Sequence, residues 1–202
     1  MHPQGKSALI APDGMPNSLL AGLVEKGQTV LAIDAFATGE SQSPDAATPD
    51  PHVGFFACFN RTLVAQRAHD ILTAIAGLQS RPHIQKVHLI GLDQAGPWCL
   101  LARGLCGNSV ARTAIEIGSN NFANVKDVAD PMYLPGALKY GDLPVLAALS
   151  APGELMIHRA REFDTSWLKD AYRNSHDKSN SENLRIDEEP ASTEKILGWL
   201  TR

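Results

Sequence analysis

The chain has 202 residues, of which 44% are hydrophobic and 20% are charged, and its formal net charge is −4. This composition is typical of a globular protein with a substantial core, and we expect residues 1–202 to form a single domain. The lack of a basic excess argues against nucleic acid and anionic membranes as partners, and no apolar run approaches the roughly 20 residues of a membrane span. The first residues lack the pattern of a secretory signal, so the expected location is the cytoplasm.

Segments that are typical of strands alternate with segments of helical periodicity along the chain. In chain order we expect strand 6–12, helix 18–26, strand 28–36, a polar loop at 38–54, helix 61–79, strand 86–92, helix 95–105, strand 111–117, a loop-rich stretch at 118–145, strand 154–160, helix 164–175, strand 183–189 and helix 192–202. Asn17 or Ser18 can cap the first of these helices. The alternation predicts an α/β fold, a three-layer sandwich with a mostly parallel sheet of about six strands.

The stretch "HLIGLDQAGPWCLLARGL" at residues 88–105 joins an apolar strand to a helix through a turn of small residues. Gly91-Leu92-Asp93-Gln94-Ala95 fits the pattern G-x-nucleophile-x-G with alanine in the last position, and it resembles the nucleophile elbow of the α/β-hydrolase superfamily. The stretch "VLAIDAFATGES" at residues 30–41 also resembles the strand and glycine turn that precede the elbow in these hydrolases.

Three further stretches resemble a narrower group, bacterial proteins identified as acetyl-xylan-esterase-like or dienelactone-hydrolase-like. They are "FFACFNRTLVAQRAHDILTAIAGL", "LPGALKYGDLPVLAALSAP" and "FDTSWLKDAYR". Together with the elbow, the resemblance covers nearly the whole chain.

The resemblance implies a sheet in which the strand at 6–12 corresponds to the third strand of the superfamily. The first two strands of the superfamily are then missing, and residues 28–36 lie at an open edge of the sheet. A long apolar edge strand favours aggregation unless another chain pairs with it. We therefore expect a homo-oligomer such as a dimer, or a partner segment, at residues 28–36.

The resemblance also implies the roles of a catalytic site. Asp93 takes the place of the nucleophile, as in haloalkane dehalogenases and epoxide hydrolases, which attack through a carboxylate. Asp164 follows the strand at 154–160 and takes the place of the acid, with Glu162 as the nearby alternative. The oxyanion hole would use the amide of Gln94 and a second amide from Gly14 or Met15.

The general base of the family is missing from its expected place. A histidine should follow the last strand, but "PASTEKILGWLTR" contains none, and Glu188 or Glu189 stands roughly where it belongs. His158, at the end of its strand, is the best substitute and His52 the second. An alternative reading is that Asp93 and Asp164 cap the helices that follow them, since aspartate is favoured at helix starts.

Three functions follow from these patterns. The first is an α/β-hydrolase relative with a degenerate site, weakly active or non-catalytic. The second is an active hydrolase of small esters or acetylated carbohydrate that uses Asp93 and His158, so a small ester or carbohydrate is the expected ligand. The third, a Rossmann-like or flavodoxin-like binding domain, is disfavoured because the chain lacks a phosphate-binding glycine loop. The sequence shows no spacing typical of a metal site, and we expect neither a metal nor another cofactor.

Overall fold

The computed structural model describes residues 1–42, 56–174 and 182–202. Its helices are α1 (Ser18–Glu25), α2 (Phe56–Phe59), α3 (Leu63–Gln79), α4 (Ala95–Cys106), α5 (Asp142–Ala148), α6 (Ser166–Asn174) and α7 (Thr193–Leu200). Short 3₁₀ helices are η1 (Lys6–Leu9), η2 (Gly39–Ser41), η3 (Gly107–Ser109), η4 (Phe122–Asn124) and η5 (Ala137–Tyr140). The strands are β1 (His88–Gly91), β2 (Arg112–Glu116), β3 (Glu154–His158) and β4 (Leu184–Ile186).

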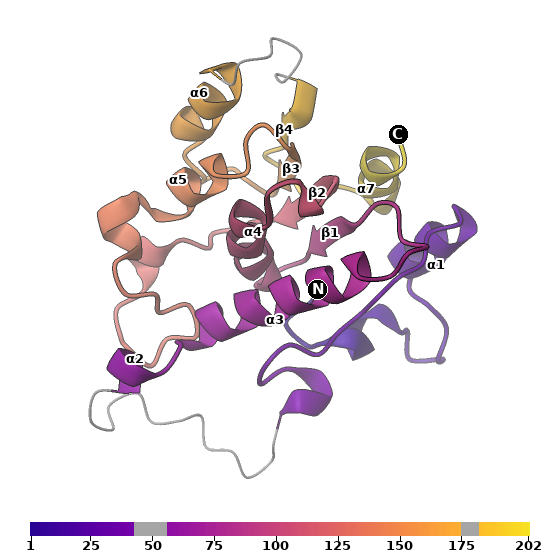
Figure 1. Cartoon of the computed structure of the whole chain (residues 1–202), viewed down its shortest axis with the longest axis horizontal. Helices are drawn as coiled ribbons and strands as arrows, with labels where there is room; N and C mark the ends of the chain where they lie inside the picture. The colour runs from indigo at the N-terminus through magenta and orange to yellow at the C-terminus, as the bar shows by residue number, and fades with distance from the viewer. Residues whose placement is uncertain (43–55, 175–181) are drawn as a thin grey trace.

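The four strands form one parallel sheet in the order β1-β2-β3-β4. A helix lies in each connection between consecutive strands, as parallel strands require. Figure 1 shows the strands side by side, with α1 and α7 on one side of the sheet and α3 to α6 on the other. The predicted α/β class is therefore confirmed.

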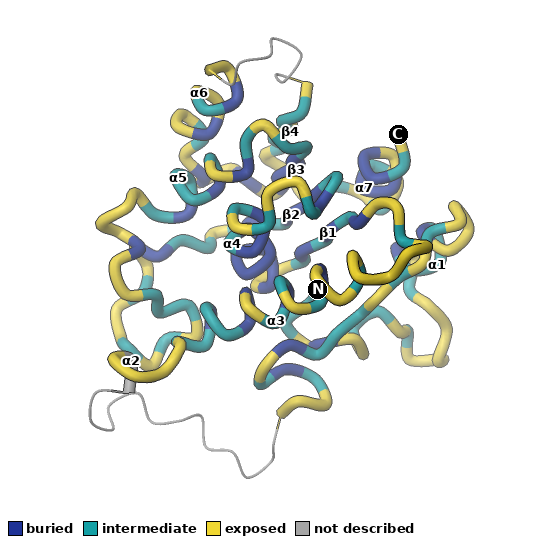
Figure 2. The backbone as a smooth tube through the Cα atoms, viewed as in Figure 1, coloured by how far each residue is buried: buried dark blue, intermediate teal, exposed yellow. Residues whose placement is uncertain are grey.

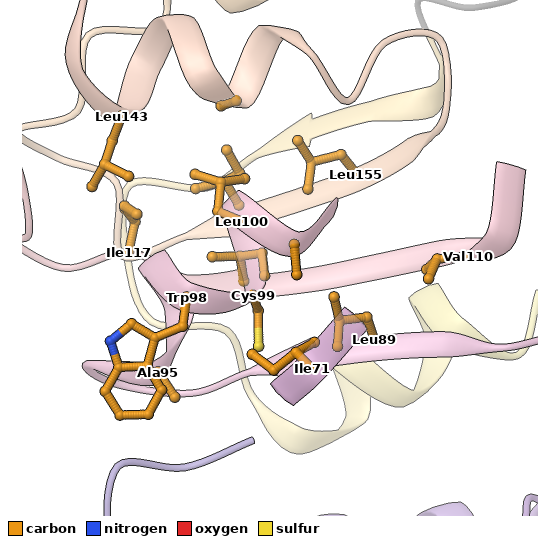
Figure 3. Packing of buried hydrophobic residues seen from close by; sticks show 14 of the residues in the cluster. Ile71, Leu89, Ala95, Trp98, Cys99, Leu100, Val110, Ile117, Leu143 and Leu155 are labelled. Atoms are coloured by element: carbon orange, nitrogen blue, oxygen red, sulfur yellow. The ribbon is translucent and has the colours of Figure 1, made fainter. Parts of the chain in front are cut away.

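The alternating side chains of the strands supply two apolar cores. On one face Leu89, Ile115 and Ile157 pack against the group of helices from α3 to α6, and Figure 3 shows part of this cluster around Cys99 and Leu100 of α4. On the other face Ala114 and Met156 pack against α1 and α7. Figure 2 shows that the buried residues follow the strands and the sheet-facing sides of the helices.

The prediction of about six strands is wrong for the two segments nearest the start of the chain. Residues 6–9 form η1 instead of a strand. Gly5 precedes it with a φ of +78°, which bends the backbone out of the extended conformation, and the amide of Lys6 donates to Oδ1 of Asp34. Ile10 then pairs with Pro16 in an isolated antiparallel bridge around a turn, so no extended chain reaches the sheet from here.

Residues 28–35 form neither helix nor strand, although the run is as apolar as a buried strand. A strand needs a neighbour about 4.8 Å away to pair its backbone groups, and this segment has none within the described residues. The edge strands of the sheet are β1 and β4, so the expectation that residues 28–36 form the open edge strand is wrong.

Candidate functional site: the turn after β1

The turn between β1 and α4 has the geometry of a tight elbow. Asp93 has a φ of +49°, in the left-handed region that residues with a side chain seldom adopt. A Cβ on Gly91 would lie 2.8 Å from Cβ of Cys99, and a Cβ on Gly96 would lie 1.8 Å from the carbonyl oxygen of Glu116. The small residues on both sides of Asp93 therefore allow α4 to start directly against the ends of β1 and β2.

The carboxylate of Glu116, at the end of β2, holds this turn in place. Its Oε2 accepts the backbone N–H of Asp93 at 3.1 Å, and its Oε1 accepts Nη1 of Arg159 at 3.0 Å. Arg159 follows β3 and also has a left-handed φ, of +55°. Three strand ends are thus joined at the carboxyl edge of the sheet, which is the edge where parallel sheets place their ligand sites.

The side chain of Asp93 is exposed at this edge and does not cap the helix. Residue Gln94 occupies the N-cap position of α4, and no side chain accepts a hydrogen bond from the first turn. Within the described ranges, the Asp93 carboxylate accepts no hydrogen bond from a helix amide. The capping role expected as an alternative for Asp93 is therefore not what the structure shows.

Asp164 behaves differently from Asp93. Its Oδ1 accepts the backbone N–H of Ser166, the first residue of α6, at 2.9 Å. This hydrogen bond lowers the pKa of the Asp164 carboxyl. The capping role is confirmed here, and no contact links Asp164 to the turn at Asp93 within the described residues.

His158 lies at the same edge of the sheet, beside Glu116 in the register of β2 and β3. The residue is only 2% exposed, and burial lowers the pKa of its imidazole although the nearby carboxylates of Glu116 and Asp187 oppose this. Its Nδ1 accepts the backbone N–H of Ala191 at 3.4 Å, while its buried Nε2 has no partner. The neutral ring therefore carries its proton on Nε2.

His2 is the functional candidate that the sequence did not single out. The charges of Asp93 and Glu116 act on its imidazole and raise its pKa, while burial, the larger effect, lowers it. Its Nδ1 accepts the backbone N–H of Gln4 at 3.1 Å, so its neutral form also carries the proton on Nε2. Because His2 stands far from Asp93 in the sequence, no spacing pattern could have paired them.

Neither histidine is arranged as a general base for Asp93. A base that removes a proton through Nε2 needs a free lone pair on that atom, which usually requires Nδ1 to donate to a carboxylate. In both rings Nδ1 accepts instead. No hydrogen bond joins a histidine to the Asp93 side chain in the part of the chain that the structure describes, and His52 lies outside that part.

The expected oxyanion-hole amides of Gly14 and Met15 are already used. The amide of Gly14 donates to the carbonyl of Ala11 at 2.8 Å, and that of Met15 donates to Oδ1 of Asp13 at 3.0 Å. Both stabilise the turn between η1 and α1. The amide of Gln94 follows Asp93 directly, as the elbow pattern requires.

Two of the acidic residues after β4 form ion pairs. Glu189 forms an ion pair with Arg161, and Asp187 binds Lys195 at 2.8 Å and Arg185 at 3.1 Å. These contacts fasten the segment after β4 to the start of α7. Among the described residues, no group of histidine, cysteine and acidic side chains is placed to hold a metal ion.

No family model matches this chain, and no curated protein or solved structure is significantly similar to it. In the described ranges no helix is long and apolar enough to cross a membrane. Inference about function therefore depends on the geometry at Asp93.

Proposed function

We propose that this chain is a non-hydrolytic relative of the α/β-hydrolase superfamily, in its motifs closest to acetyl-xylan-esterase-like and dienelactone-hydrolase-like proteins. It keeps the nucleophile elbow as a structural turn at the carboxyl edge of the sheet. The support for the relationship is the turn itself, with its left-handed Asp93 and the packed Gly91 and Gly96. Fold resemblance alone says little about activity, because function resides in sites.

The proposed absence of hydrolytic activity rests on one observation. His158 and His2 both accept a backbone amide at Nδ1, and neither bonds to the Asp93 carboxylate. Attack by the Asp93 carboxylate on an ester substrate would give an anhydride. Attack on an alkyl carbon, as in the dehalogenases, would give an ester intermediate on Asp93, and a base would still be needed to activate the water that hydrolyses it. Without that base, a covalent intermediate could form only once.

A second function has one observation in its favour. The Asp93 carboxylate is exposed and uncapped, and it stands on a strained turn, which together suit an attacking group better than a structural one. This function is hydrolysis of small esters or acetylated carbohydrate, with His158 or His2 as the base after a rearrangement.

Hydrolysis of p-nitrophenyl acetate and p-nitrophenyl butyrate separates the two functions. The proteins to compare are the wild type, Asp93→Asn and His158→Ala, with Asp170→Asn, an exposed aspartate of α6, as the matched control. We expect all four to match the buffer blank while circular dichroism shows them folded. Turnover by the wild type and the control that Asp93→Asn abolishes would establish the active hydrolase instead.

A further inference from the structure

A cavity of about 180 Å³ lies between β1, α3 and the segment at residues 28–33, away from the turn at Asp93 for most of its length. It exists because the two predicted strands near the start of the chain do not form. Within the described residues, the free edge of β1 is hydrogen-bonded only at its end, where the amino group of Met1 donates to the carbonyl of Ile90 and the amide of Leu92 donates to the carbonyl of Met1. The remaining length of that edge faces the cavity.

The walls of this cavity are mainly apolar. They include Leu23 of α1, Val30 and Ile33 of the segment at 28–33, Ile75 of α3 and Leu89 of β1. Apolar cavities of about 150 Å³ stay free of water and bind small apolar molecules such as benzene. This cavity therefore has the size and lining to take a short alkyl chain or an aromatic ring.

The end of the cavity near the start of β1 is polar, and two of its polar groups have no partner among the described residues. His88 lines it, and the buried Nδ1 of that imidazole has no hydrogen-bond partner among the described residues. Lys86 lines it too and forms no ion pair with a described residue. The other lysine of the lining, Lys6, is already held by Asp34 at 3.2 Å and Glu40 at 2.6 Å.

The charges around this end favour an anion. The acidic side chain whose charge acts on His88 is Glu154, and its carboxylate pairs with Arg112 at 2.8 Å and with Arg202 at 2.6 Å. The positive charges that act on His88 are those of Arg112 and Lys86. Arg112 is held by Glu154 and by the carbonyls of Leu200 and Arg202, so Lys86 is the cation at this end that has no ion pair with a described residue.

We propose that this cavity binds a small amphiphilic carboxylate, such as a medium-chain fatty acid. The alkyl chain fills the apolar space between α3 and the segment at 28–33, and the carboxylate lies beside Lys86 and Nδ1 of His88. Met1, His2 and Leu92, near the turn at Asp93, also line this cavity. The proposed binding uses neither Asp93 nor its chemistry, so it does not depend on whether Asp93 is active.

Isothermal titration calorimetry with octanoate, octanol and acetate tests this proposal on the purified full chain at low ionic strength. Octanoate should bind saturably at one site. Octanol lacks the charge and should bind several-fold more weakly, and acetate lacks the tail and should not bind detectably. Absence of saturable octanoate binding, or equal affinity for octanol, would overturn the proposal.

Two variants place the ligand in this cavity. Ala74→Phe fills the apolar space from α3 and should abolish octanoate binding, whereas Ala76→Phe, on the exposed side of the same helix, should leave it unchanged. Lys86→Gln should weaken octanoate by about two- to fivefold, as an exposed ionic contact does, without changing octanol. Its control, Lys126→Gln, removes a distant exposed lysine.

Lys86→Gln changes an exposed residue, so it still tests the location of the ligand if Ala74→Phe fails to fold. Octanoate that binds Ala74→Phe as tightly as the wild type occupies another place, and the assignment to this cavity is then wrong. The same conclusion follows if Lys86→Gln and Lys126→Gln weaken octanoate equally.

Discussion

At the scale of single residues, the imidazole of His158 is the buried titratable group of the candidate site. Burial lowers its pKa below the ordinary 6.5, and the opposing charges of Glu116 and Asp187 do not offset this. The pKa values of His2 and His88 are lowered for the same main reason. All three rings therefore favour the neutral form in the folded chain.

These lowered pKa values predict a loss of stability in mild acid. As the pH falls below about 6.5, the unfolded chain takes up protons that the folded chain does not, so the free energy of unfolding decreases. Each such group contributes at most about 1.4 kcal/mol per pH unit. Urea unfolding at pH 7.5 and 5.5 should show a decrease for the wild type and a smaller decrease for His158→Gln.

The carboxyl groups do not interfere with this comparison. Those with lowered pKa values, among them Asp34 and Glu154, have ordinary values of 3.8 and 4.5 and titrate below the chosen window. An equal loss of stability in the wild type and in His158→Gln would show that this imidazole is not the source.

At the scale of secondary-structure elements, the close approach of α4 to the sheet depends on a glycine in the first turn of the helix. A Cβ at Gly96 would overlap the backbone carbonyl of Glu116, which cannot rotate away as a side chain could. The same carbonyl belongs to the residue whose carboxylate holds Asp93. The elbow is therefore fixed by backbone packing as well as by hydrogen bonds.

A pair of glycine substitutions tests this packing. Gly96→Ala should lower the free energy of unfolding by about 3 kcal/mol, the upper end of the usual cost of overpacking. Gly77→Ala, on α3 with open space around its Cα, should raise it by about 0.5–1 kcal/mol because alanine favours the helix. Denaturant unfolding of both variants gives the comparison, and similar values for the two would contradict the proposed role of Gly96.

From residue 61 onward the sequence predicted the strands and the helices at 61–79, 95–105, 164–175 and 192–202, because their apolar residues follow clear periods. It missed α5 (Asp142–Ala148), which begins within the stretch at 118–145 that was expected to be rich in loops. The strands at 86–92, 111–117, 154–160 and 183–189 are all present, each in shorter form. The two strands expected near the start failed because local apolarity shows only that a segment can be buried. Whether a strand forms also depends on a pairing partner, and periodicity carries no information on that.

The candidate site could be predicted only in part, because only its local features are visible in the sequence. The turn at Asp93 is local, so its small residues were visible as a motif. The carboxylate of Glu116, the guanidinium of Arg159 and the ring of His2 come together only through the sheet and the return of the chain's first residues to β1. Their convergence is a property of the fold and has no signature in residue spacing.

At the scale of the whole molecule, large apolar side chains are exposed in the region before α3. They are Ile10, Met15, Val24, Leu31 and Phe36, with exposed fractions from 46% to 62%. Exposed apolar side chains that gather on one part of a surface are typical of an interface. We propose that a second copy of the chain covers these exposed side chains.

Self-association should therefore be measurable by light scattering during size-exclusion chromatography. The wild type should exceed its monomer mass of 21.7 kDa as its concentration rises. The double variant Leu31→Lys with Phe36→Lys should remain monomeric because it places charges in the contact. Leu138→Lys, which charges an exposed leucine of η5, should behave like the wild type. A wild type that stays monomeric at high concentration would refute the interface.

The cavity beside β1 also determines how this fold responds to compression. Unfolding removes the part of this cavity that is closed to water, so the volume of the system decreases and hydrostatic pressure favours the unfolded chain. The region around Gly96 has no space left to lose, whereas the region between β1 and residues 28–33 has about 180 Å³. Pressure would therefore destabilise first the side of the sheet where the two expected strands do not form. A molecule bound in the cavity would fill this space and make that side more resistant to pressure.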